Sequence, residues 1–322
     1  MSLQPVHLIN PMRNAAGGSE WRTIQIFELL ADRTSITLWS PETPDPALLG
    51  RVPIRRIEAR AGAFPRGGNL VFIGTYFKVE PWIAHSRANR IIFIHNLDSD
   101  YALQSALNAA TGRGLPEAEV AYASADLRDR ADGPFGEVHP SPLDFDRFKP
   151  SPRLDRPFTV GRVSRDVLLK HHPEDPAIYQ QLAEAGVKVR ILGGTLFESE
   201  LAGVENIELL PENSILVEEY LNQIDCFYYR THPDWYETWG RVVLEAMACG
   251  VPVVAEGRHG FREYLTDDQA FTTADEAVQK ILSLRENSKW EAQSEVSLSQ
   301  ARKTLSDEVI QHLVDYYTRE KR

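Results

Sequence analysis

Two carboxylates in the stretch His232–Glu256 (HPDWYETWGRVVLEAMACGVPVVAE) have a type and spacing that could bind a polar ligand. Glu237 lies in a polar segment, and Glu245 lies inside an apolar run that ends at Gly250. The run predicts a buried helix from about Trp239 to Cys249. A carboxylate inside such a helix must be paired or hydrogen-bonded, so Glu245 needs a specific partner.

The start of this predicted helix has the features of an anion site. Thr238 is the expected N-cap, and Gly240 leaves the N–H groups of the first turn accessible. Helix N-termini favour phosphate. A carboxylate such as Glu245 can accept hydrogen bonds from both hydroxyls of a sugar cis-diol. A phosphate site next to a ribose site would fit a nucleotide. Alternatively, Glu245 forms an ion pair with Arg241, and Glu237 is a solvated loop acid. The residues alone leave both interpretations open.

The run ETWGRVVLEAMACGVPVVA resembles the E-x7-E signature of retaining glycosyltransferases with the two-Rossmann-domain fold, GT-B. The match is to family four, the glycosyl transferases group 1. The resemblance implies that Glu237 contacts the donor sugar and that Glu245 binds the ribose. It also implies that backbone N–H groups of Trp239, Gly240 and Arg241 hold the diphosphate.

Two further segments resemble elements of the same family. VGRVSRDVLLKHHPED is similar to a G-R-(x)n-K element, which implies that Arg162 and Lys170 neutralise the leaving diphosphate. The gap between them is longer than is usual in the family, so Arg165 is an alternative to Lys170. NAAGGSEWRTIQIFELLA resembles the glycine-rich first loop, and its Gly17 and Gly18 are candidates for donor binding.

The segment RIIFIHN places His95 at the end of a predicted buried strand, where ligands bind in open α/β sheets. The resemblance implies that this histidine contacts the donor sugar near the reacting carbon. Nearby, Asp98-Ser99-Asp100 is a D-x-D pattern that holds a divalent metal in the other glycosyltransferase fold. We interpret Asp100 instead as a helix cap, and expect no essential metal and no cofactor beyond the nucleotide-sugar substrate.

Short apolar runs alternate with amphipathic stretches along the chain, which predicts parallel sheets covered on both faces. The segment His139–Pro157 is rich in proline and charge and reads as a linker. The expected organisation is α/β, with two Rossmann-like doubly wound domains that, by the resemblance, face a cleft. Residues 1–150 form the acceptor-side domain, residues 151–300 bind the nucleotide sugar, and residues 301–322 form a helix that packs back towards the N-terminal domain. The predicted strands are Val6–Ile9, Ser35–Trp39, Leu70–Ile73, Arg90–Ile94, Phe158–Val160, Val187–Leu192, Cys226–Tyr229 and Val251–Val254.

Composition excludes several classes of protein. The 322 residues are 43% hydrophobic and 25% charged, and no apolar run is long enough to span a membrane. Two cysteines, Cys226 and Cys249, exclude a disulfide framework and a cysteine-ligated zinc site. A net charge of -11 argues against broad nucleic-acid binding. Residues 51–66 carry five arginines against one acid, which indicates either a solvated basic loop or contact with an anionic lipid.

The resemblance implies a retaining, metal-independent glycosyltransferase for hexosyl or related transfer. The expected donor is a UDP-, GDP- or dTDP-sugar, and the expected acceptor is a glycan or lipid-linked hydroxyl, as in bacterial polysaccharide or glycolipid assembly. We expect a cytoplasmic location, with peripheral contact at the inner membrane face as a further option. The alternatives are a non-catalytic glycosyltransferase-like binding subunit and a GT-B sugar-nucleotide epimerase, and transfer to an acceptor separates all three.

Overall fold

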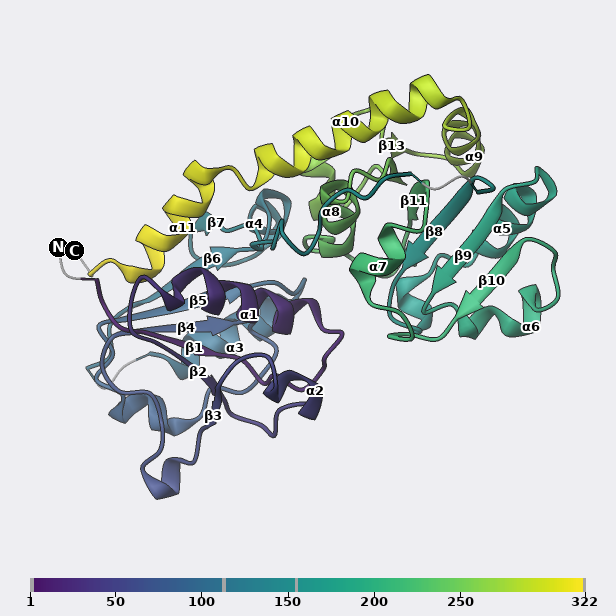
Figure 1. Cartoon of the computed structure of the whole chain (residues 1–322). Helices are drawn as coiled ribbons and strands as arrows, with labels where there is room; N and C mark the ends of the chain where they lie inside the picture. The colour runs from purple at the N-terminus through teal and green to yellow at the C-terminus, as the bar shows by residue number, and fades with distance from the viewer. Residues whose placement is uncertain (1–2, 112–113, 154–155, 321–322) are drawn as a thin grey trace. The chain divides into compact units, whose positions relative to one another are not determined.

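The computed structural model describes residues 3–111, 114–153 and 156–320, and the chain forms two compact units. Unit 1 comprises residues 1–143 and 305–322, and unit 2 comprises residues 144–304 (Figure 1). Each unit contains one parallel sheet with helices on its faces, so the predicted α/β class is confirmed. The segment predicted as a C-terminal helix, residues 301–322, contains the end of α10 (Asn287–Thr304), which belongs to unit 2, and all of α11 (Asp307–Thr318), which belongs to unit 1.

Unit 1 is built on a seven-stranded parallel sheet in the order β3-β2-β1-β4-β5-β6-β7. Its strand order reverses between β1 and β4, which makes the carboxyl ends of these strands the expected place for a ligand. The strands are β1 (Val6–Ile9), β2 (Ile36–Ser40), β3 (Ile54–Arg56), β4 (Asn69–Ile73), β5 (Arg90–His95), β6 (Ala118–Tyr122) and β7 (Glu137–Val138).

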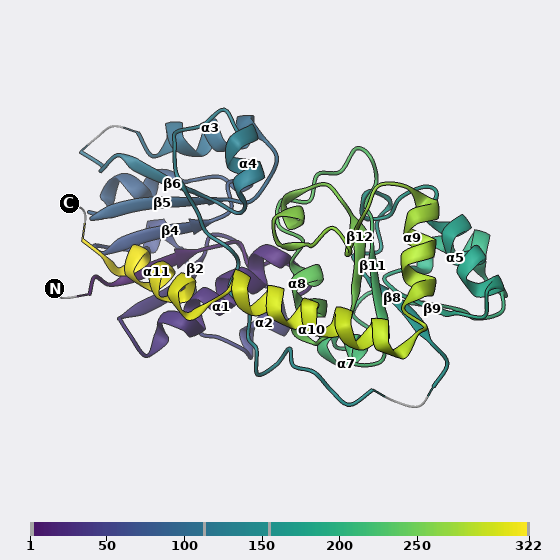
Figure 2. The same cartoon turned by 90° about the horizontal axis from the view of Figure 1, so that it is seen from above.

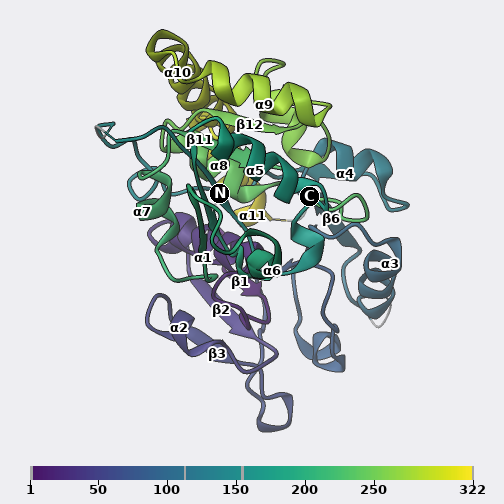
Figure 3. The same ribbon diagram turned by 90° about the vertical axis from the view of Figure 1, so that its right-hand side faces the viewer.

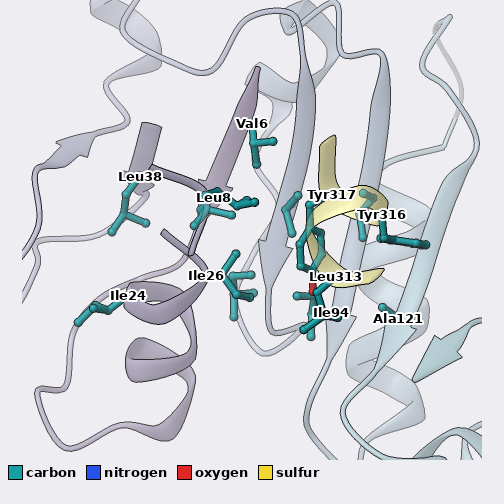
Figure 4. Packing of buried hydrophobic residues seen from close by; sticks show 14 of the residues in the cluster. Val6, Leu8, Ile24, Ile26, Leu38, Ile94, Ala121, Leu313, Tyr316 and Tyr317 are labelled. Atoms are coloured by element: carbon teal, nitrogen blue, oxygen red, sulfur yellow. The ribbon is translucent and has the colours of Figure 1, made fainter. Parts of the chain in front are cut away.

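Apolar side chains cover both faces of this sheet because strand residues alternate between faces. In β4, Val71 and Ile73 pack on the face covered by helices α1 (Gly18–Ala31) and α11. Figure 4 shows other members of this cluster, among them Leu8, Ile26 and Leu313. Leu70 and Phe72 pack on the opposite face, against η2 (Pro81–His85) and α3 (Asp100–Ala109). Shorter helices complete the unit: α2 (Pro46–Leu49), η1 (Ala59–Ala61) and α4 (Ala125–Arg130). The last helix is therefore part of the unit 1 core.

Unit 2 repeats the design with six parallel strands in the order β10-β9-β8-β11-β12-β13. Here the order reverses between β8 and β11, so the loops that follow these two strands lie at the expected ligand-binding edge. The strands are β8 (Thr159–Val163), β9 (Lys188–Leu192), β10 (Ile207–Leu210), β11 (Cys226–Tyr229), β12 (Val253–Glu256) and β13 (Ala270–Phe271).

Helices also cover both faces of the second sheet (Figure 2). One face packs against α5 (Asp175–Glu184), α6 (Glu198–Leu201) and α9 (Ala274–Ser283). In Figure 2, α8 (Arg241–Ala248) lies on the other side of the strands, and α10 packs against it. The remaining elements are η3 (Leu168–Lys170), η4 (Thr195–Phe197), α7 (Val217–Leu221) and η5 (Gly260–Tyr264).

The basic segment of residues 51–66 forms the edge strand β3 and the turn η1 and projects beyond the sheet of unit 1 (Figure 3). Arg55, Arg56 and Arg66 line a hollow there together with Trp39 and Phe64. Arg66 lies 4.1 Å from the centre of the Phe64 ring, so this cation is held against an aromatic face. Within the described ranges, no helix has the length and apolarity needed to cross a bilayer.

Candidate active site

Arg162, on β8, is a buried cation at the switch point of the second sheet. Its Nη1 atom lies 3.7 Å from Asp175 Oδ2, and its guanidinium lies 4.9 Å from the centre of the Tyr229 ring. Its Nη2 atom donates to the backbone carbonyl of Lys170, eight residues later. Burial raises the pKa of Asp175 to about 6, although Arg162 and a hydrogen bond from Tyr228 oppose that rise. Arg162 therefore fixes the loop that carries Lys170.

Lys170 and Glu237 form an ion pair, which brings together two of the residues predicted to act on the donor. The lysine Nζ also lies 4.4 Å from the centre of the Trp235 ring. Glu237 accepts from Tyr229 Oη at 3.2 Å and from Trp235 Nε1 at 3.4 Å. Burial would raise the pKa of Glu237, but the Lys170 ammonium outweighs it and holds the pKa below its usual range. Glu237 is thus an ionised, preorganised acceptor.

Arg165 lies on the loop between Arg162 and Lys170 and is half-buried. The pKa of Lys170 is lowered mainly by burial, with a smaller contribution from the positive charge of Arg165. Two cations of this loop, Lys170 and Arg165, therefore add their fields at the edge of the sheet where an anion is expected.

Helix α8 begins at Arg241, with Gly240 as its N-cap, so the predicted cap at Thr238 is wrong. Gly240 has a left-handed backbone (φ 67°), and a Cβ added there would lie 2.5 Å from the Phe261 ring. The absence of a side chain at Gly240 lets Phe261 pack against the start of the helix, while Tyr264 Oη holds the carbonyls of Trp239 and Gly240 at 2.7 and 2.8 Å. The glycine is required by a contact that is distant in the sequence.

Glu245 lies in the second turn of α8, is almost fully buried, and is paired with Arg241 Nε at 2.7 Å. The ion pair considered as an alternative from the sequence is therefore present. Burial raises the pKa of Glu245, while Arg241 and Arg147 lower it and Glu218 raises it further. Arg147 and Glu218 form a second pair with two contacts of 2.8 Å. Glu245 thus belongs to a network of alternating charges beside the helix start.

His259 is a residue that sequence reasoning missed, and it fixes the backbone of Glu237. Its Nδ1 atom accepts from the Glu237 N–H at 3.3 Å, and the adjacent Gly260 N–H donates to the Glu237 carbonyl at 3.0 Å. Because Nδ1 is an acceptor, the ring proton is on Nε2, which lies 3.1 Å from Thr231 Oγ1. The sequence feature that could have indicated this role is a histidine followed by a glycine in the loop after a buried strand.

The backbone of His259 is strained. Its φ of 73° and ψ of 176° lie in a region that only glycine adopts readily. Such a conformation costs of the order of 1–3 kcal/mol and persists only where the surroundings impose it. The imidazole is buried against the rings of Tyr236 and Phe261, and it supplies the two hydrogen bonds described above. The strain therefore accompanies a side chain that holds the Glu237 loop.

His95 is the corresponding feature of unit 1, at the carboxyl end of β5. Thr75 Oγ1 lies 2.8 Å from its Nδ1, and the buried Nε2 has no hydrogen-bond partner among the residues that the structure describes. Burial lowers the pKa of His95 to about 4, while Asp98 and Asp100 act in the opposite direction. His95 is therefore a neutral imidazole with one nitrogen available to a ligand.

The glycine-rich loop lies beside this strand end. Gly17 is the N-cap of α1, and a Cβ there would lie 2.0 Å from Glu20 Oε2, whereas Gly18 is open on the side where a Cβ would stand. Ser19 Oγ accepts from Asn10 at 3.0 Å and from Asn96 at 3.2 Å. These polar residues, which sequence reasoning missed, tie the loops after β1 and β5 to the start of α1.

The D-x-D pattern is used for local structure. Ser99 is the N-cap of α3 and accepts from the Ala102 N–H at 3.3 Å, so the predicted cap at Asp100 is wrong by one residue. Asp100 accepts from the Asp132 N–H at 2.8 Å, and Asp98 pairs with Arg130 at 3.2 Å. Both carboxylates therefore have protein partners.

Residues 160–287 match the family model described as Glycosyl transferases group 1, so the resemblance that the E-x7-E run suggested is confirmed for this region. None of the curated protein sequences matches the chain.

Solved structures show the same fold over the whole chain. Anabaena Alr3699/HepE in complex with UDP-glucose is 17% identical, with a TM-score of 0.74 and coverage of 98% of both chains. A glycosyltransferase from Rickettsia africae ESF-5 is 12% identical, with a TM-score of 0.73 and coverage of 98% of both chains. WaaG, a glycosyltransferase involved in lipopolysaccharide biosynthesis, is 14% identical with a TM-score of 0.67, over 97% of this chain and 99% of WaaG. The predicted GT-B fold is thereby confirmed.

Proposed function

We propose that the chain, whose residues 160–287 match the Glycosyl transferases group 1 model, transfers a sugar from a nucleoside-diphosphate donor to a hydroxyl acceptor with retention. The observation that carries the proposal is the Lys170–Glu237 pair at the switch point of the second sheet, in the same unit as the N-terminus of α8. This arrangement offers cations and helix N–H groups to a diphosphate and a carboxylate to sugar hydroxyls.

The leaving diphosphate is stabilised by Lys170, by Arg165 and by the backbone at Trp239, Gly240 and Arg241. Arg162 is almost fully buried, so we assign it to positioning Lys170 through the Lys170 carbonyl and to adding its positive field. As the bond from the anomeric carbon to the phosphate oxygen breaks, negative charge accumulates on the diphosphate. Preorganised cations stabilise this charge without having to reorient.

Glu237 orients sugar hydroxyls, Glu245 accepts from the ribose hydroxyls, and His259 holds Glu237 in place. None of these residues acts as a nucleophile in the proposed reaction. The acceptor oxygen attacks on the face from which the diphosphate leaves, and the departing phosphate oxygen takes the acceptor proton. By the resemblance, His95, Gly17 and Gly18 are further candidates for contact with the donor. The reaction as proposed needs no metal.

The HepE structure contains UDP-glucose, which makes UDP the first nucleotide to test, and the role of WaaG points to polysaccharide or glycolipid assembly. The arginines of residues 51–66 are the proposed contact for an anionic lipid or a lipid-diphosphate acceptor. Contact of this kind would place the protein at the inner face of the membrane.

The test measures thermal stabilisation by UDP, GDP, dTDP and ADP, each with and without Mg²⁺. A nucleotide at about a hundred times its dissociation constant adds roughly 2.7 kcal/mol to stability, which is a shift of several degrees. We expect one nucleotide to stabilise the protein equally with Mg²⁺ and with EDTA. Release of that nucleotide from its sugar, dependent on an acceptor, separates a transferase from an epimerase and from a binding subunit. Absence of stabilisation by all four nucleotides would refute the donor site.

A further inference from the structure

Glu137, His139 and His312 form a cluster in unit 1, on a part of the molecule that the transferase chemistry does not use. Glu137 lies on β7, and His139 follows two residues later, so strand alternation places both side chains on one face. His312 lies on α11, one turn before Tyr316, whose ring contacts the His139 ring at 4.3 Å between centroids. The nearest ligand atoms of the three side chains all lie within 4.8 Å of one another.

From this geometry we propose that Glu137, His139 and His312 bind one Zn²⁺ ion and that the ion clamps the C-terminal helix α11 onto the edge strand β7. Two imidazoles and a carboxylate are a ligand set that zinc uses, with a water molecule in the fourth position. Mg²⁺ and Ca²⁺ prefer oxygen ligands, so they do not fit this set. This inference does not depend on the proposed transferase function.

The spacing of the ligand atoms suits a small tetrahedral ion. Metal–ligand distances of 2.0–2.1 Å place neighbouring ligand atoms about 3.3 Å apart. Glu137 Oε2 lies 2.6 Å from His312 Nε2 and 3.7 Å from His139 Nε2, which brackets that spacing. The two histidine nitrogens lie within 4.8 Å of each other, so coordination requires them to adjust around the ion, and His312 is exposed enough to move.

His139 provides a second, independent indication of a ligand. The ring is fully buried, and its Nε2 faces Glu137 but has no hydrogen-bond partner among the described residues. A buried polar atom without a partner is costly. The other ring nitrogen, Nδ1, lies 3.0 Å from Tyr317 Oη, the outer contact that orients zinc-binding histidines and leaves Nε2 as the ligand atom. An ion at this point would satisfy the unpaired nitrogen.

Two arginines oppose an ion here. The buried Arg22 donates through Nη2 to the backbone carbonyl of His139, and Arg319 faces Glu137. Arg319 Nη2 lies 3.8 Å from Glu137 Oε1, the oxygen that faces away from the two histidines, and the Arg319 side chain is nearly half exposed. Water screens its repulsion, and Oε2 remains directed at the histidines. We therefore expect Arg319→Ala to strengthen zinc binding modestly.

The experiment uses the full chain, stripped with EDTA and then freed of the chelator, and titrates it with Zn²⁺ by calorimetry and by thermal unfolding. We expect one ion to bind and the unfolding midpoint to rise by several degrees, whereas Mg²⁺ gives neither effect. His312→Ala removes a half-exposed ligand without opening the core, so the metal-free variant should unfold like the wild type yet bind zinc at least tenfold more weakly. Tyr317→Phe, which removes the outer contact of His139, should weaken binding about tenfold.

His85 is an exposed histidine outside the cluster and gives the matched control, His85→Ala. If the wild type shows no zinc-dependent heat or stabilisation, the proposal is overturned. It is also overturned if His85→Ala weakens binding as much as His312→Ala, because zinc then binds surface histidines without selection. Co²⁺ adds a direct readout, since the visible spectrum of a four-coordinate site should appear in the wild type and disappear in His312→Ala.

Discussion

Replacing His259 by glycine separates the strained backbone from the imidazole, because glycine adopts the observed φ of 73° without cost. The variant loses two neutral hydrogen bonds, to the Glu237 N–H and to Thr231, each worth about 0.5–1.5 kcal/mol. It also releases backbone strain of roughly 1–3 kcal/mol. The two changes are of similar size and opposite sign, so they offset each other to within about 2 kcal/mol. The remaining loss of stability comes from the packing of the buried ring against Tyr236 and Phe261.

His259→Ala loses the same hydrogen bonds but keeps most of the strain, since alanine also disfavours positive φ. It should therefore be less stable than His259→Gly, an order opposite to the usual rule that glycine destabilises. Chemical denaturation of both variants measures this difference. A glycine variant that is less stable than the alanine variant would refute the strain argument.

Activity is expected to move independently of stability. Without the imidazole, the Glu237 N–H loses its acceptor and the loop is free to depart from the productive geometry. A loss of about 1–3 kcal/mol in positioning corresponds to a fall in kcat of roughly 5- to 150-fold, at about 1.4 kcal/mol per tenfold. KM for the donor should change little, because Glu245 and the start of α8 are intact. Free imidazole should restore part of the rate in His259→Gly, with His85→Gly as the unaffected control. Wild-type kcat in His259→Gly would refute the positioning role.

Three further results are expected. Glu237→Gln should lower the rate of transfer by about a hundredfold or more without weakening nucleotide binding, because Lys170 loses its carboxylate partner and is released towards the diphosphate. Steady-state kinetics measure the rate and calorimetry measures the binding, with Glu174→Gln, at an exposed acid, as the control. Weaker nucleotide binding in Glu237→Gln would contradict the assignment. Glu245→Ala should abolish the thermal shift given by the nucleotide, whereas Arg241→Ala should keep most of it; the reverse order would mean that Glu245 serves only as the partner of Arg241. The pKa of His95 in the folded chain is about 4, below its ordinary value of 6.5, so the unfolded chain takes up the proton first as the pH falls. The stability due to this group is therefore present above pH 6.5 and is lost as the pH falls towards 4. That loss is roughly 3 kcal/mol in total, and His95→Gln should unfold with a weaker pH dependence in this window; an unchanged dependence in denaturant titrations would refute the buried neutral state.

Most of the central strands could be predicted because parallel strands covered on both faces are continuous apolar runs. β4 and β5 show this directly, since every residue in them is buried. The strands β3, β6, β7, β10 and β13 were missed for the same physical reason. β6 and β10 are partly exposed, and β13 has two residues. β3 is exposed and contains arginines, and β7 has two residues, so neither has an apolar signal.

The site residues divide in a similar way. The register of Glu237, Gly240 and Glu245 could be predicted because it depends on one helix and the loop before it. The sequence predicted the helix cap at Thr238 instead of at Gly240. The left-handed backbone of Gly240 follows from the approach of Phe261, twenty-one residues later, which no local pattern indicates. His259 was missed because a positive φ in a histidine follows from tertiary packing rather than from any local preference.

The two buried pairs, Lys170–Glu237 and Arg241–Glu245, share one electrostatic logic. In each, the carboxylate is assigned to hydroxyls of the donor, and the cation or its backbone is assigned to the diphosphate. A buried ion pair adds little stability by itself, because desolvation of both charges offsets their attraction.

Under the proposed function, the pairs keep the empty site neutral. Arrival of the diphosphate draws Lys170 towards phosphate oxygens, and the carboxylates then accept from hydroxyls of the donor. A diphosphate without its sugar should therefore leave Glu237 with no hydroxyl partner. The intact nucleotide sugar should then stabilise the protein more than the nucleoside diphosphate at equal saturation, and Glu237→Gln should remove that difference. Equal stabilisation of the wild type by both ligands would contradict this exchange of partners.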